Sequence, residues 1–223
     1  MQFLSNVLIW LYNNLAFQDL GIAIILLTVI IRIILLPLFY KSFKNQALMQ
    51  KLQPEIKRLQ ELHKNNKEKQ VEETLTLYRR HKVNPFTSFL LILAQLPILI
   101  ALYRLFLRDF PGLNDHFLGL IDLKETSMIM VSLTAISQYL QGWLSLPRKS
   151  ASITDDSSQR VARQMVWLGP ILSIVILINL PAALSLYWLT TTLFSAGQQF
   201  YLNKRMENYG TDKSENPKHP PIL

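Results

Sequence analysis

Five long apolar stretches limit what this chain can fold into. They cover residues 21–40, 86–107, 126–146, 164–180 and 182–202 of a 223-residue sequence. A bilayer core about 30 Å thick needs roughly 20 helical residues to cross it, and these stretches are near that length. The last two are separated only by Pro181, which predicts a tight helical hairpin. The sequence therefore predicts an all-α polytopic membrane protein with five transmembrane helices.

The segments between and beside these stretches predict helices and loops outside the membrane core. Residues 1–20 carry apolar residues at helical spacing among polar ones, which indicates an amphipathic helix in the membrane interface or an extended start of the first span. Residues 41–85 carry two runs with helical periodicity, separated at "HKNNKEK", and predict a helical hairpin of coiled-coil type. Pro54 is expected to kink or restart the first run. The remaining segments are predicted as an interfacial loop, a polar loop and a disordered tail: 108–125, 147–163 and 203–223.

Basic residues fix the predicted orientation. The net charge is +8, and 19 of the 23 Lys and Arg fall in segments 41–85, 147–163 and 203–223. With five spans, all three segments lie on one side of the membrane. Because short cytoplasmic loops are enriched in Lys and Arg, we expect the N-terminus outside and the C-terminus in the cytoplasm.

One charge lies inside the first apolar stretch. Arg32 is nine residues before Lys41, or about 13 Å along a helix at about 1.5 Å per residue. A centrally placed arginine costs at least about 2.5 kcal/mol in a bilayer. None of the five stretches contains an Asp or Glu that could pair with it. Arg32 is therefore expected to face water or neutral polar groups; capping of backbone carbonyls is the structural alternative.

Neutral polar side chains are plentiful in the same stretches. Together they could line a hydrophilic groove that opens toward the basic side, although each taken singly is also typical of ordinary interhelical hydrogen bonding. The candidates for the groove are Arg32, Thr28, Gln95, Tyr103, Gln138, Gln141, Thr191 and Gln198.

Several function classes are disfavoured. The chain has no cysteine, its four histidines lie in loops or the tail, and it has no HExxH, GxSxG or P-loop pattern, so we expect no catalysis, metal or cofactor. Ion-coupled transport usually needs intramembrane carboxylates. An assembly scaffold and a small-solute channel remain as alternatives to the capture of a polypeptide's polar segment during its passage across the bilayer.

Several motifs occur in an order and spacing that resembles the YidC-type membrane protein insertases, in their short five-span form. These motifs cover about residues 20–205 and are "GIAIILLTVIIRIILLPL", "LQPEIKRLQ", "LYRRHKVNP", "LAQLPILIALYRLF", "FLGLIDL" and "PAALSLYWLTTTLFSAGQQFYLNK". The chain departs from the family pattern at Ala183, where glycine is typical, at Thr191 and Thr192, where a Ser-Asn pair is commoner, and near Gly119, where tryptophan is usual.

The resemblance implies a function. In the family, the arginine at the position of Arg32 makes a cytoplasm-facing groove positive, and the groove takes up hydrophilic segments of nascent membrane proteins before their apolar segments pass into lipid. It also implies that the hairpin and tail approach the ribosome or the Sec translocon, with no direct readout of nucleic acid. On this basis we expect an insertase and chaperone in the cell membrane of a prokaryote, and we expect that it is not an enzyme.

Overall fold

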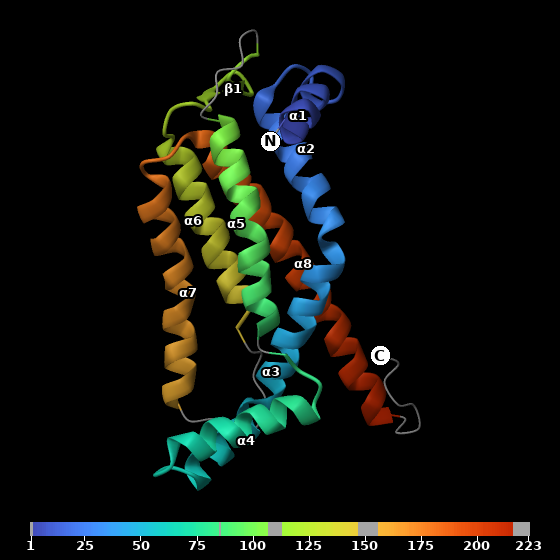
Figure 1. Ribbon diagram of the computed structural model, residues 1–223, viewed down its shortest axis with the longest axis vertical. Helices are drawn as coiled ribbons and strands as arrows, with labels where there is room; N and C mark the ends of the chain where they lie inside the picture. Colours follow the sequence, from blue (N-terminus) through green and yellow to red (C-terminus); the bar gives the residue numbers. More distant parts are fainter. Residues whose placement is uncertain (1, 85, 107–112, 147–155, 216–223) are drawn as a thin grey trace.

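The computed structural model describes residues 2–84, 86–106, 113–146 and 156–215, and nearly all of them are helical. Figure 1 shows the arrangement, in which most helices run side by side in one bundle. The elements are α1 (Gln2–Asn14), α2 (Leu20–Ile34), α3 (Leu36–Leu62), α4 (Lys67–Arg80), α5 (Phe86–Phe106), β1 (His116–Phe117), β2 (Ile121–Asp122), α6 (Met128–Leu144), α7 (Asp156–Leu177) and α8 (Ala182–Glu215).

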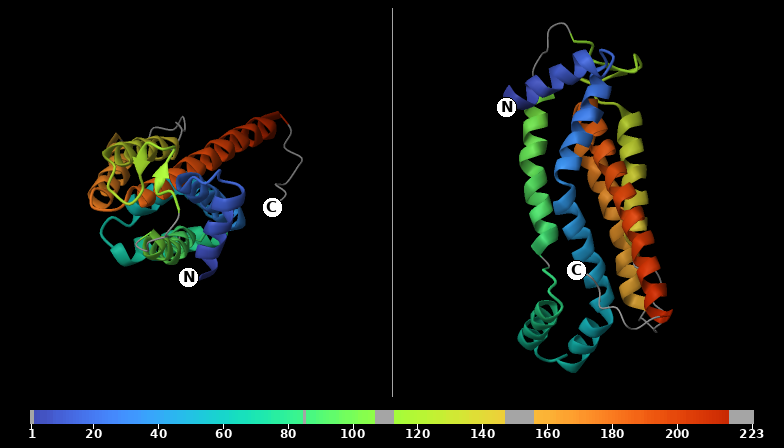
Figure 2. Two further views of the ribbon diagram at one scale, coloured as in Figure 1. Left: turned by 90° about the horizontal axis from the view of Figure 1, so that it is seen from above. Right: turned by 90° about the vertical axis from the view of Figure 1, so that its right-hand side faces the viewer.

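The bundle consists of α2, α5, α6, α7 and α8. Helix α6 packs along both α7 and α8, and α2 packs on α8 (Figures 1 and 2). The main apolar core lies at the N-terminal end of the bundle, where α1 and the loop before α6 cover it. Its most deeply buried large side chains are Leu8, Leu11, Ile24, Leu27, Leu123, Leu177 and Leu184. The helices that contribute to this core meet at the end of the bundle drawn uppermost in Figure 1.

The predicted first span, 21–40, consists of parts of two helices. Helix α2 ends at Ile34, and α3 begins at Leu36 with a proline in its first turn and an axis bent by 65° from that of α2. Proline has no N–H to donate into the preceding turn, which accounts for the break here. Judged by length and hydropathy, this bent pair meets the threshold for crossing a membrane, while no individual helix in the described ranges does. The count of five spans stays a prediction.

The predicted helical hairpin is formed by the second half of α3 and by α4. The break falls at His63–Asn66, and the Asn66 side chain caps α4 by accepting a hydrogen bond from the Lys69 N–H at 3.0 Å. Leu52 and Ile56 of α3 are buried against the second arm and the residues that follow it. Helix α3 runs through Pro54 without restarting.

The opposite end of the bundle is closed by α1 and a short β-hairpin. Helix α1 lies across the top of the bundle in Figure 2, right. The carboxylate of Asp19 accepts hydrogen bonds from the N–H groups of Ile22 (2.9 Å) and Leu118 (2.6 Å), so it caps α2 and attaches the hairpin to it. The strands pair antiparallel through a turn in which Leu118 and Gly119 both have positive φ, and the sequence had predicted only a loop there.

Helix α8 is longer than the predicted fifth span. The sequence predicts disorder from residue 203, whereas α8 continues to Glu215. Extending an existing helix adds one hydrogen bond for each residue fixed, and the first proline after α8 begins is Pro217. The start of α8 is tied to the loop before α6, because Ala182 and Ala183 donate backbone hydrogen bonds to the carbonyl oxygens of Glu125 (2.7 Å) and Leu123 (3.0 Å).

Candidate substrate-binding pocket

A pocket of about 430 Å³ opens among the helices below the apolar core, and we call it the Arg32 pocket. It receives side chains from both sides of the α2–α3 break and from α5, α6 and α8. The residues that line it are Arg32, Phe39, Phe43, Gln95, Leu96, Leu99, Gln138, Gln141, Tyr187, Trp188, Thr191, Thr192 and Ser195. The lining combines one cation, several neutral polar groups and aromatic rings, and it contains no carboxylate.

Arg32 is buried in this pocket, with 5% of its surface exposed. Its Nη1 donates to the Ser195 Oγ at 3.2 Å, and its guanidinium carbon lies 4.3 Å from the centroid of the Phe39 ring. A guanidinium has five N–H donors, and the structure gives Arg32 no ion pair with a carboxylate in the described part of the chain. The cation is therefore held by a hydroxyl and a ring face, which leaves it able to pair with an acid that enters from outside.

The hydroxyl that meets Arg32 is itself positioned by α8. The Ser195 Oγ donates to the Thr191 carbonyl oxygen, one turn earlier, at 2.9 Å. Because the serine proton is used in this way, the lone pairs of its oxygen point to the guanidinium. On the far wall, the Gln95 amide of α5 hydrogen-bonds the Tyr187 hydroxyl of α8. These contacts join α2, α5 and α8 around the cation.

Gln138 connects three helices. With its amide oriented so that nitrogen donates to the Gly169 carbonyl oxygen of α7 (2.7 Å), its oxygen accepts from the Trp188 indole N–H of α8. A Cβ at position 169 would lie 2.8 Å from the end of this amide, so the absence of a side chain at Gly169 is what admits it. Gln138 therefore supports the pocket wall as well as lining it.

The structure brings five of the eight predicted groove residues into the Arg32 pocket: Arg32, Gln95, Gln138, Gln141 and Thr191. The other three lie elsewhere. Thr28 is buried, but its hydroxyl donates to the Ile24 carbonyl oxygen at 2.7 Å within α2. Tyr103 is 38% exposed on α5, outside the lining, and Gln198 lies on α8 outside the lining with its buried Oε1 lacking a hydrogen bond in the described part of the chain.

The aromatic half of the pocket was not predicted. Phe39 follows Arg32 by seven residues, two helical turns, so its spacing was a usable signal that the residues shared a face. Tyr187 and Trp188 were visible in the motif "LSLYWL", but in an apolar stretch an aromatic residue looks the same whether it faces lipid or a pocket. Ser195 lies three turns beyond Ser185 and carried no signal of its own.

The pocket offers binding rather than covalent chemistry. Its groups are hydrogen-bond donors and acceptors with a single cation, which suits an anionic or polar peptide segment. No cluster of three or more His, Asp or Glu side chains that would hold a metal ion is found among the described residues.

The fold and the pocket define a class: a helical bundle with a buried cation in a polar pocket and a basic helical hairpin outside the bundle. The chain belongs to the family described as 60Kd inner membrane protein, whose model matches residues 10–209. The resemblance read from the motifs is thereby confirmed. The family description supports location in a prokaryotic cell membrane.

Relatives and a solved structure agree with this assignment. The chain is 35% identical over 194 residues to "Membrane protein insertase YidC" of Clostridium tetani, covering 86% of each protein. It is 34% identical to "Membrane protein insertase MisCA" of Bacillus subtilis, covering 90% of this chain and 74% of that one. A crystal structure of an active YidC insertase superposes with a TM-score of 0.62 at 27% identity, covering 89% of this chain and 45% of that one.

Some relatives are much longer than this chain. The YidC of Syntrophus aciditrophicus is 36% identical over 199 residues, and these make up 35% of its length. These residues span 88% of the present chain.

Proposed function

We propose that this protein is a membrane protein insertase and chaperone whose Arg32 pocket takes up the polar segment of a nascent membrane protein. One observation supports this most directly: Arg32 is buried, and the described residues provide no carboxylate for it. A buried charge without a partner is costly, and an acidic or polar segment of the substrate would supply the missing counter-charge. The names of the relatives, all insertases, support the same conclusion.

The proposed mechanism needs no bond to be made or broken in the substrate. The polar segment exchanges water for the guanidinium, hydroxyl and amide groups of the pocket, which lowers the cost of leaving water. The substrate's apolar segment then passes into lipid, and the hydrophobic effect makes this step favourable. The apolar core of α1, α2, α6 and α8 would close the outer end, so that the segment enters from the side of the hairpin.

The membrane arrangement is part of the proposal. Five spans, with the N-terminus outside and the C-terminus in the cytoplasm, would place the pocket's open side and 19 of the 23 basic residues on the cytoplasmic side. The hairpin of α3 and α4, with eleven Lys and Arg against five Glu in 41–85, would then meet the partners. We propose these as the nascent chain and the lipid surface, with the ribosome and the Sec translocon as further partners.

The test compares two arginines. Arg32→Ala removes the cation of the pocket, while Arg104→Ala removes an exposed cation on α5 and serves as the matched control. Because a charge-assisted hydrogen bond contributes about 1.5–3 kcal/mol, Arg32→Ala should reduce insertion of a substrate with an acidic translocated segment by about 10- to 100-fold. Arg32→Lys should retain most activity if charge matters more than guanidinium geometry. Normal insertion by Arg32→Ala at equal protein abundance would contradict the proposal.

A further inference from the structure

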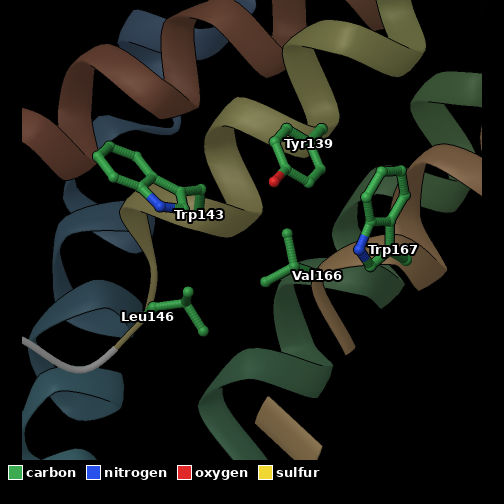
Figure 3. Close-up of a pocket in the computed structure, with 5 residues that line it drawn as sticks. All are labelled: Tyr139, Trp143, Leu146, Val166 and Trp167. Carbon is green, nitrogen blue, oxygen red and sulfur yellow. The ribbon is translucent and has the colours of Figure 1, made fainter. Parts of the chain in front are cut away.

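A second cavity, of about 370 Å³, lies between α6 and α7, and we call it the α6–α7 pocket. Its lining is separate from that of the Arg32 pocket and consists of Tyr139, Trp143, Leu146, Val166 and Trp167. Figure 3 shows Trp143 and Leu146 on one side, Val166 and Trp167 on the other, and Tyr139 between them. The pocket is near the end of α6 that leads into the segment 147–163.

Close approach of the two helices frames this cavity. A Cβ at Gly142 of α6 would lie 3.1 Å from the Val166 Cγ1 of α7, and Gly169 of α7 meets Gln138 of α6. Small residues let helix backbones approach in this way. The rings of Tyr139 and Trp167 are stacked at an angle, with centroids 4.8 Å apart, and form one wall. The cavity is thus a feature of the α6–α7 packing.

The chemistry of the lining is amphipathic. Leu146, Val166 and the ring faces are apolar, while the Tyr139 hydroxyl and the indole N–H groups of Trp143 and Trp167 are hydrogen-bond donors. The lining contains no carboxylate. Trp and Tyr with this combination of ring and donor are enriched where acyl chains meet lipid headgroups.

Positive charge in the sequence lies beside the same site. Arg163 precedes Val166 by three residues and Trp167 by four in α7, so its position is on the same helix face, one turn nearer the start of α7. Arg160 is one turn earlier. The segment 147–163 has four basic residues and two acidic ones. Basic pockets between membrane helices on the cytoplasmic side are suited to anionic lipid headgroups.

We propose that the α6–α7 pocket binds one anionic phospholipid of the cytoplasmic leaflet. One of its two acyl chains lies in the apolar cavity, and its phosphate meets the Trp and Tyr donors beside the turn of α7 that carries Arg163 in the sequence. The choice of leaflet rests on the proposed orientation, but lipid binding itself does not depend on insertase activity.

The test measures lipid retention by the full-length protein. The purified chain is equilibrated with equimolar phosphatidylglycerol and phosphatidylcholine, and bound lipid is counted by native mass spectrometry. We expect wild type to retain one phosphatidylglycerol in preference to phosphatidylcholine. Trp143→Phe/Trp167→Phe removes both indole donors while keeping aromatic volume, and should lower this retention at least fivefold. Trp10→Ala, an exposed tryptophan on α1, should leave it unchanged.

A further variant tests the preference for an anionic lipid. Arg163→Gln should abolish the preference for the anionic lipid while leaving total lipid binding close to wild type. Equal retention of the two lipids by wild type, unchanged retention by the double Trp variant, or retention of a polypeptide instead of a lipid would each overturn the proposal. Since insertion is assayed separately, these outcomes are distinguishable from a failure of the Arg32 proposal.

Discussion

The bridge made by Gln138 predicts a penalty for a single methyl group on α7. In Gly169→Ala, the new Cβ would lie 2.8 Å from the end of the Gln138 amide. The amide is the flexible end of a side chain, so it will move away and lose its hydrogen bonds to the Gly169 carbonyl oxygen and the Trp188 indole. At about 0.5–1.5 kcal/mol for each bond, the variant loses about 1–3 kcal/mol.

A second glycine supplies the control. Both substitutions gain about 1 kcal/mol of helix propensity, and a Cβ at Gly197 of α8 meets nothing within 4 Å. The difference between Gly169→Ala and Gly197→Ala therefore isolates the lost bridge. We expect the free energy of unfolding of Gly169→Ala to be about 1–3 kcal/mol lower than that of Gly197→Ala. It is measured by SDS titration in mixed micelles, followed by tryptophan fluorescence.

A double-mutant cycle tests the cause. In a Gln138→Ala background there is no amide to displace, so the difference between the two glycine variants should fall below about 0.5 kcal/mol. If Gly169→Ala is as stable as Gly197→Ala in the wild-type background, or if the difference persists without Gln138, the bridge does not hold the three helices as described.

Two predictions concern the end of the bundle capped by α1. Asp19→Ala removes the acceptor for the N–H groups of Ile22 and Leu118, so it should lower the free energy of unfolding by about 1–3 kcal/mol and speed amide hydrogen exchange at both residues. Unchanged exchange at Leu118 would contradict the link between α2 and the β-hairpin. Gly21→Ala places a Cβ into the ring of Phe117 and should lower the free energy of unfolding by about 1–3 kcal/mol, a penalty that Phe117→Ala should relieve. Equal penalties with and without the Phe117 ring would show that this contact is not the cause.

The polar half of the Arg32 pocket could be predicted from the sequence, because the free-energy cost of placing a polar group in an apolar stretch marks such residues as exceptional. A charge or an amide in an apolar stretch is expensive unless it has a partner, so Arg32, Gln95, Gln138 and Gln141 stood out, and the structure gathers them. Thr28 also stood out, but a threonine in a helix can satisfy itself on the preceding turn, as it does with Ile24. Polarity alone does not distinguish these outcomes.

The hairpin was predictable and the bend at Leu35 was not. The step of three and four along α3 and α4 and the Asn65–Asn66 break define the hairpin through local periodicity. Pro37 was visible in the sequence, but a proline in the first turn of a new helix and a proline that kinks a continuous one share the same local pattern. The packing that decides between them involves distant residues.

The most direct test of the central claim is a crosslink between the Arg32 pocket and a stalled nascent membrane protein. A photoreactive amino acid is placed at Gln141, which lines the pocket, or at Ile136, which is 65% exposed on the same helix outside it. The account predicts that position 141 crosslinks to the substrate's polar translocated segment, that position 136 does not, and that Arg32→Ala abolishes the crosslink at 141. Equal crosslinking of that segment at both positions, or a crosslink at 141 that does not depend on Arg32, would contradict it.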